Sequence, residues 1–306
     1  MKRSVASIKV KDVATLTERK AYAFVLGGAI LWGTTGTAQT FIPETVDSFV
    51  VATMRLSIGG VVLLLLLLGL GQIHPSRWPL LTIVFVALAL ALFQVCFFSS
   101  VRLTGVAVGT VVSIGSAPIF SGLLEWVFLR RPPNRQWRIA TALAIVGTGL
   151  LFLNKELVVI DPLGILFAFG AGFLFASYTF LNKKVLERVD TIEAIAVVFT
   201  LSALMLWPFF FQFRSEGLWT KPGIIAVLYI GLVTTALGYI LFVQGLKYIP
   251  SSSATTLSLA EPFTATLLGV VVVGEYLNAS AWLGVGLLML GIVLVTLRPE
   301  TLKRYR

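Results

Sequence analysis

The chain has 306 residues, of which 57% are hydrophobic and 12% are charged, and its formal net charge is +10. A soluble domain is about 45–50% apolar and about 25% charged, so this chain lacks the polar residues that a water-soluble surface needs. Lys and Arg lie in short patches between apolar runs without a nucleic-acid motif, which argues against a nucleic-acid partner. Composition therefore predicts an integral membrane protein whose main partner is the lipid bilayer.

The residues that most enzymes and metal sites depend on are scarce. The single cysteine, Cys96, lies inside an apolar run, so an internal disulfide is impossible. The single histidine, His74, stands beside Pro75 in a short connection, which argues against a histidine-based metal site and against a Ser–His–Asp arrangement. We therefore expect a protein that is not an enzyme, with no catalytic residue, no metal and no cofactor.

The predicted elements follow from the length of the apolar runs, because a bilayer-spanning helix needs about 20 mostly apolar residues. In chain order the predicted spans are 21–41, 46–70, 78–101, 105–129, 136–153, 162–182, 191–213, 222–245, 252–274 and 279–297. The expected organisation is a tail (1–20), a first five-helix unit (21–153), a linker (154–161), a second five-helix unit (162–298) and a second tail (299–306). The fold class is thus an all-α membrane protein with ten transmembrane helices.

The distribution of positive charge predicts the orientation of these spans. Residues 1–20 are rich in Lys and Arg and have no apolar core, so they are expected to form a cytosolic tail and not a cleavable signal peptide. With this tail inside, most Lys and Arg residues fall on cytoplasmic segments, as the positive-inside rule requires. Both termini are therefore expected in the cytoplasm, with the chain in a bacterial-type inner membrane.

The two halves of the chain resemble each other at an offset of 143–144 residues. The offset pairs Trp32 with Phe175, Phe98 with Phe242, Pro118 with Pro262, Asn134 with Asn278, and Gly147 with Gly291. Each half holds five predicted spans, an odd number, so the second half must enter the membrane upside-down relative to the first. Inverted repeats of this kind recur in secondary transporters, where they place the substrate site near the middle of the membrane.

Three charged residues lie inside predicted spans, where a charge costs about 2.5–3.5 kcal/mol on insertion scales. Glu261 directly precedes Pro262, and it is interpreted as a proton site or a partner for a substrate ammonium, or as half of a structural ion pair with Arg55. Arg55 itself pairs with an acid or holds a substrate carboxylate. Glu125 lies about one turn from the end of its span and is expected to reach the interface.

Uncharged polar and aromatic residues complete the candidate site. A lipid-facing amide such as that of Gln94 would be costly, so it is expected to face protein or water. The predicted substrate-binding residues are Trp32, Thr35, Arg55, Gln94, Phe98, Ser113, Tyr178, Tyr239, Ser258 and Glu261. Pro118 and Pro262 are expected to be hinges in their helices. Five further tryptophans are expected to anchor the chain at the membrane interfaces: Trp78, Trp137, Trp207, Trp219 and Trp282.

Several short motifs, in this order and spacing, resemble the drug/metabolite transporter superfamily, and specifically its ten-helix exporters built from two EamA-type repeats. The motifs are Trp32-Gly33, Arg55, Ser116-Ala117-Pro118-Ile119-Phe120, Glu261-Pro262-Phe263, Gly274-Glu275-Tyr276-Leu277, Gly284 and Gly291. The resemblance covers roughly residues 21–298. One departure is Arg130-Arg131, which stands where the family often has a Gly-Glu pair.

The resemblance implies a basket of helices around a central cavity and the export of amino acids or other small metabolites, with the aromatic amino-acid exporters as the nearest subgroup. The function predicted is therefore a secondary transporter that exports a small-molecule substrate by alternating access. One alternative is exchange of nucleotide-sugars or phosphorylated metabolites, which calls for two or more cations at mid-membrane, where only Arg55 is found. A membrane-embedded enzyme and a passive channel are the others. The pattern predicts no particular coupling ion or oligomeric state.

Overall fold

The computed structural model describes residues 2–152, 161–274 and 276–297, and every regular element within these ranges is a helix. The elements are α1 (Lys2–Gln39), α2 (Ser48–Gly69), η1 (Pro75–Arg77), α3 (Leu80–Leu129), α4 (Arg135–Phe152), α5 (Pro162–Val185), α6 (Thr191–Phe210), α7 (Lys221–Tyr229), η2 (Ile230–Leu237), α8 (Gly238–Leu246), α9 (Ser251–Leu257), α10 (Ala260–Leu268), η3 (Gly269–Val273) and α11 (Ala279–Leu297). Residue 275, most of the predicted linker 154–161 and the predicted tail 299–306 lie outside the described residues.

Within the described ranges, eight segments are long and apolar enough to cross a membrane. They are Ser48–Gly69, Leu80–Gly105, Val108–Leu129, Pro162–Val185, Thr191–Phe210, Lys221–Leu246, Ser251–Val272 and Ala279–Thr296. The other two predicted spans fall on the second half of α1 and on α4, which is helical but starts with Arg135, Gln136 and Arg138. The all-helical membrane class is confirmed, and the count of ten spans stays a prediction.

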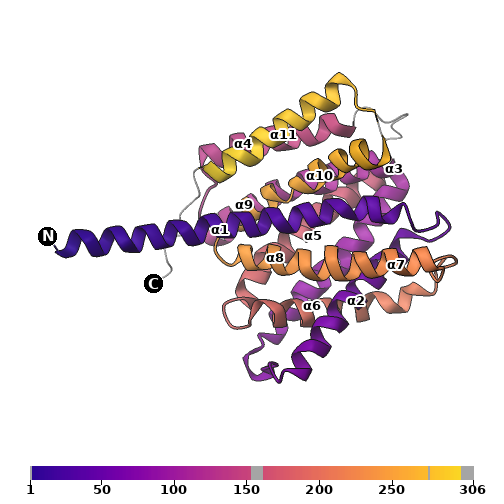
Figure 1. Ribbon diagram of the computed structural model, residues 1–306, viewed down its shortest axis with the longest axis horizontal. Coiled ribbons are helices and arrows are strands. Elements are labelled where there is room, and N and C mark those ends of the chain that lie inside the picture. Colours follow the sequence, from indigo (N-terminus) through magenta and orange to yellow (C-terminus); the bar gives the residue numbers. More distant parts are fainter. Residues whose placement is uncertain (1, 153–160, 275, 298–306) are drawn as a thin grey trace.

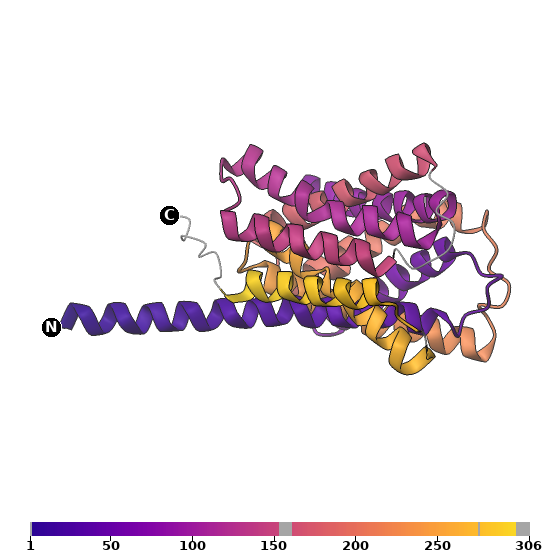
Figure 2. The ribbon, with the colours of Figure 1, turned by 90° about the horizontal axis from the view of Figure 1, so that it is seen from above.

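The helices run back and forth between two ends of one bundle (Figure 1). The N-terminal end is defined by connections 70–79, 130–134, 186–190 and 247–250, and α1 projects beyond the bundle there (Figure 2). The opposite end is defined by connections 40–47 and 211–220 and by Gly105. Gly105 interrupts α3 with φ 81° and ψ 162°, a conformation that glycine adopts without a Cβ penalty, so α3 contains two spans joined by a tight reversal.

Close packing between the two halves depends on small residues. In α1, a Cβ on Gly28 would lie 2.6 Å from the carbonyl oxygen of Gly238, and one on Gly33 would lie 2.7 Å from that of Glu261. Helix α1 therefore packs directly against α8 and α10 of the second half. In the same way α5 of the second half packs against α3 of the first, and α2 packs against α6.

Helices α4 and α11 form an antiparallel pair at the edge of the bundle (Figure 1), and their contacts are reciprocal. A Cβ on Gly147 would meet the backbone of Gly284 and Leu288, while a Cβ on Gly291 would meet that of Ala140 and Ala144. Adding 144 to the α4 residue numbers in these contacts (140, 144 and 147) gives the α11 residue numbers (284, 288 and 291). Asn134 and Asn278, paired by the same offset, cap the two helices alike by accepting from the backbone N–H three residues on.

Alanine at Gly147 or at Gly291 should destabilise the protein by similar amounts, about 1–3 kcal/mol, because each methyl group would overlap backbone of the facing helix. Gly149 and Gly286 are matched controls on the same two helices, since a Cβ there meets nothing within 4 Å. Thermal unfolding of the four purified variants in detergent tests the prediction. A loss of stability in only one of the Gly147 and Gly291 variants would contradict the reciprocal packing.

Candidate functional site

An aromatic cluster lies in the middle of the bundle where α1, α5 and α8 meet. The Trp32 ring lies 4.5 Å from the Tyr239 ring and 4.8 Å from the Phe242 ring, centroid to centroid. Phe175 meets Trp32 edge-on at 6.2 Å, and Tyr178 lies 6.1 Å from both Phe175 and Tyr239. We call these five residues the central cluster. All of them are buried, so they form a packed wall of rings between the two halves.

Three of the predicted polar residues lie beside this cluster. The guanidinium of Arg55 donates a hydrogen bond to Oε1 of the fully buried Gln94 at 3.1 Å. Arg55 and Glu261 are close enough to interact electrostatically, and both also act on Tyr239. One basic and one acidic side chain therefore share the middle of the bundle with the aromatic wall. The structure thus brings together Trp32, Arg55, Gln94, Tyr178, Tyr239 and Glu261 from six different helices.

The polar atoms at this place have hydrogen-bonding capacity that the protein does not use. Nε1 of Trp32, Nε of Arg55 and Nε2 of Gln94 are all buried and have no hydrogen-bond partner. A buried donor without a partner costs about 1–3 kcal/mol, so such groups usually have a structural or functional reason. These three unpaired donors are candidates for hydrogen bonds to a polar ligand.

The remaining predicted residues lie around this centre. Phe98 lies outside the central cluster. Its ring contacts Phe97, the Phe97 ring contacts Phe93, and the Phe93 ring contacts Phe175 of the cluster. Ser113 is buried with an unpaired hydroxyl group. The Ser258 hydroxyl donates to the carbonyl of Thr255 at 2.7 Å, and Thr35 is half-buried on α1. These four residues are therefore less direct candidates than the six at the centre.

The two equivalent prolines differ in their surroundings. Pro118 lies inside α3, which continues through it. Pro262 lies in the first turn of α10, just after the two turn residues, Ser258 and Leu259, that separate α10 from α9. Glu261 therefore stands at the junction between α9 and α10, where its backbone N–H donates to the carbonyl of Ser258 at 2.9 Å. Sequence equivalence alone does not predict this difference.

A second buried network, at the N-terminal end, was not predicted. The Glu125 carboxylate of α3 accepts hydrogen bonds from the backbone N–H of Ser251 (2.6 Å) and from the hydroxyl of Ser252 (2.5 Å). Nearby, Lys183 of α5 donates to the carbonyl of Ile249 and interacts electrostatically with Glu125. The expectation that Glu125 reaches the interface differs from this geometry, because the side chain instead turns inward and caps α9. The contacts join the two halves at this end of the bundle.

Sequence reasoning also left out Phe175 and Phe242 as site residues. Both could have been found from the repeat, since the offset pairs Phe175 with Trp32 and Phe242 with Phe98. Trp32 and Phe175 are equivalent positions that contact each other.

Eight apolar spanning segments, packed in two sets around a polar and aromatic centre, define the class: this is an integral membrane transport protein. The comparisons identify it further. The EamA-like transporter family model matches residues 19–153 and again residues 162–297. The chain therefore belongs to the EamA-like transporter family, of the drug/metabolite transporter superfamily, and its two halves are the two repeats of that family.

Relatives of known name agree with this assignment. The uncharacterized transporter YwfM of Bacillus subtilis (strain 168) is 44% identical over 280 residues, which cover 92% of this chain and 95% of the relative. The uncharacterized inner membrane transporter YicL of Salmonella typhimurium is 25% identical over 290 residues, or 91% of this chain and 96% of the relative. A crystal structure with 20% sequence identity superposes with a TM-score of 0.78 over 94% of this chain and 97% of its own, which supports the fold.

Proposed function

We propose that this transporter exports a zwitterionic small metabolite, namely an amino acid with an apolar or aromatic side chain, across the inner membrane. The observation that carries the proposal is that Arg55 and Glu261 interact electrostatically with each other and with Tyr239 of the central cluster. An amino acid carries one carboxylate for the guanidinium, one ammonium for the carboxylate, and a side chain for the aromatic wall. A phosphorylated substrate calls for surplus positive charge, whereas the charges of Arg55 and Glu261 balance.

The route we propose is alternating access between two inverted five-helix repeats. The reciprocal contacts of α4 and α11 support an axis between the halves. Because residue numbers rise along one helix as they fall along the other, that axis lies across the helices and not along them. The second halves of α1 and of α4 then serve as the first and fifth of ten spans. A pseudo-symmetric structure of this kind opens to either side of the membrane around a fixed site.

The positive-inside rule supports a cytoplasmic N-terminal end. Outside α1, nine described Lys and Arg residues belong to this end: Arg77, Arg130, Arg131, Arg135, Arg138, Lys183, Lys184, Arg188 and Lys247. The described residues at the opposite end are Arg102, Arg214 and Lys221. With this orientation, the Glu125 network lies on the cytoplasmic side. Reporter tags on the two tails should both be detected on the cytoplasmic side of the membrane. Tags detected on opposite sides would contradict the orientation.

Transport should be tested with purified protein in liposomes, by counterflow of labelled amino acids with a sugar phosphate in the same panel. We expect saturable counterflow of apolar or aromatic amino acids. Trp32→Ala should lower the rate about ten-fold, since the ring has several aromatic contacts, each of about 0.5–1.5 kcal/mol. Trp282→Ala is the matched control, because Trp282 is half-exposed on α11, away from the cluster. Flux of the sugar phosphate alone, or no flux across the panel, would contradict the proposal.

A further inference from the structure

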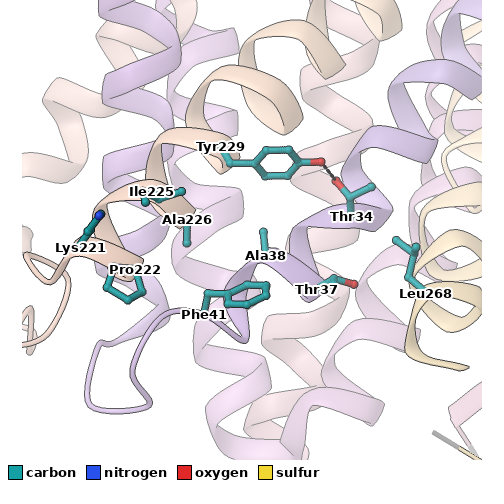
Figure 3. A pocket seen from close by; sticks show the side chains of 10 residues that line it. All are labelled: Thr34, Thr37, Ala38, Phe41, Lys221, Pro222, Ile225, Ala226, Tyr229 and Leu268. Carbon is teal, nitrogen blue, oxygen red and sulfur yellow. Dashed lines mark hydrogen bonds between the residues drawn. The ribbon is translucent and has the colours of Figure 1, made fainter. Parts of the chain in front are cut away.

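A groove of about 690 Å³ lies on the flank of the bundle between α1, α7 and α10 (Figure 3). Helix α1 contributes Thr34 and Ala38, and the turn after it contributes Phe41. Helix α7 contributes Ile225 and Tyr229, and Leu268 of α10 forms the other wall. We call this the lateral groove. Its volume falls within the range of about 300–1,000 Å³ that is typical of small-ligand sites.

The lateral groove lies on the opposite side of α1 from the central cluster. Successive residues of an α-helix turn by about 100°, so Thr34 and Thr37, which line the groove, lie about 200° and about 140° around the helix from Trp32. Trp32 points into the bundle and is buried, whereas Phe41 is 63% exposed and Ile225 on the facing helix is 58% exposed. The groove is therefore open to the lipid and is separate from the proposed substrate site.

The groove surface is apolar even though several of its residues have hydroxyl groups. Thr34 and Tyr229 hydrogen-bond to each other across the groove at 3.0 Å, as the dashed line in Figure 3 shows, and Thr34 also donates to the carbonyl of Leu31. Both walls change from α- to π-helical geometry at this place, directly after Tyr229 and directly after Leu268. π-Helical turns are rare and occur often at functional sites, which favours a ligand site on this flank of the bundle.

A positive charge beside this apolar surface indicates the class of ligand. Lys221, the first residue of α7, is exposed and lies at the end of the groove remote from Leu268 (Figure 3). It begins the span Lys221–Leu246, so its amine lies at the level of the lipid headgroups. We propose that the lateral groove binds one acyl chain of an anionic membrane phospholipid, with the lipid phosphate at Lys221. This lipid site goes beyond the transport function and does not depend on the substrate.

Native mass spectrometry tests the headgroup contact. Protein taken from nanodiscs of equal parts phosphatidylglycerol and phosphatidylcholine should retain one phosphatidylglycerol per chain. Lys221→Gln should lower the preference for phosphatidylglycerol about five-fold, the effect of one lysine near a membrane surface. Arg214→Gln is the matched control, because Arg214 is an exposed cation at the same end that does not line the groove. An unchanged preference in the Lys221 variant would overturn the proposal.

Two further variants test the acyl-chain contact. Ile225→Trp should fill the groove from its exposed rim and release the bound lipid whatever its headgroup. A photoreactive benzoylphenylalanine at Phe41 should crosslink to lipid several times more than one at Leu65 of α2, which is equally exposed at 62%. Equal crosslinking at the two positions would overturn the proposal. So would a crosslink from Phe41 to a second copy of the chain, since the groove would then be a protein interface.

Discussion

Replacing Arg55 with glutamine should both destabilise the protein and stop transport, whereas adding Glu261→Gln should restore most of the stability and none of the transport. The two side chains interact electrostatically in the middle of the bundle. Removing one of two opposite charges that interact inside a protein leaves the other charge without compensation, so each single variant should lose stability, whereas removing both should cost less. The double variant therefore has a stable fold with no charges for the ends of a zwitterion.

Two measurements separate the effect on stability from the effect on transport. Both are made on the wild type, on Arg55→Gln, on Glu261→Gln and on the double variant. Thermal unfolding in detergent gives the coupling between Arg55 and Glu261 through a double-mutant cycle, and counterflow in liposomes gives the rate. Arg102→Gln, an exposed arginine near the end of its span, is the control and should change neither. Additive losses of stability would show that the two charges are not coupled. Normal counterflow by the double variant would remove both residues from the substrate site.

The sequence predicts the parts of this structure that depend on composition and on short repeats. Apolar runs of sufficient length locate the spans, and Gly105 marks the reversal between Leu80–Gly105 and Val108–Leu129 close to its predicted place. The offset between the halves pairs Asn134 with Asn278, and these residues do cap equivalent helices. Such features are local or repeated, so each can be found without knowing which helices are neighbours.

The sequence does not predict which face of an apolar helix meets protein and which meets lipid, because both faces are equally hydrophobic. The tryptophans expected at the interfaces show the difference. Trp219 and Trp282 are exposed, in keeping with an anchor, but Nε1 of Trp78 donates to the buried Glu193 at 2.8 Å and that of Trp207 donates to Ser57 at 3.0 Å. An indole N–H at the end of a span binds lipid headgroups or a protein acceptor equally well, and only the fold decides.

Glu125 is the clearest case of a role that sequence reasoning does not find. Its partners Ser251 and Ser252 lie 126 and 127 residues further along the chain, in the other half. A carboxylate near the end of a span can reach water, so the sequence offers no reason to expect an inward orientation. The contact depends on the way α3 and α9 pack together, and this information is not present in either segment alone.

Glu125→Ala should therefore destabilise the protein and open its N-terminal end. The substitution removes the acceptor for Ser251 and Ser252 and the electrostatic partner of Lys183. A hydrogen bond to a charged group contributes about 1.5–3 kcal/mol, so we expect a loss of at least about 2 kcal/mol in thermal unfolding. Glu187→Ala is the matched control, because Glu187 also acts on Lys183 but is exposed, and surface substitutions usually change stability by less than about 0.5 kcal/mol.

Opening of the N-terminal end of the bundle can be measured with a cysteine placed one helical turn from Glu125 on α3. Ser121 is fully buried with an unpaired hydroxyl, so Ser121→Cys in a Cys96→Ala background should fold and should react slowly with a membrane-impermeant maleimide. Adding Glu125→Ala should raise the labelling rate several-fold when the reagent is supplied at the N-terminal end, and Glu187→Ala should not. If stability falls while labelling stays slow, Glu125 only caps α9, and closure of this end must depend on the close packing of the helices themselves.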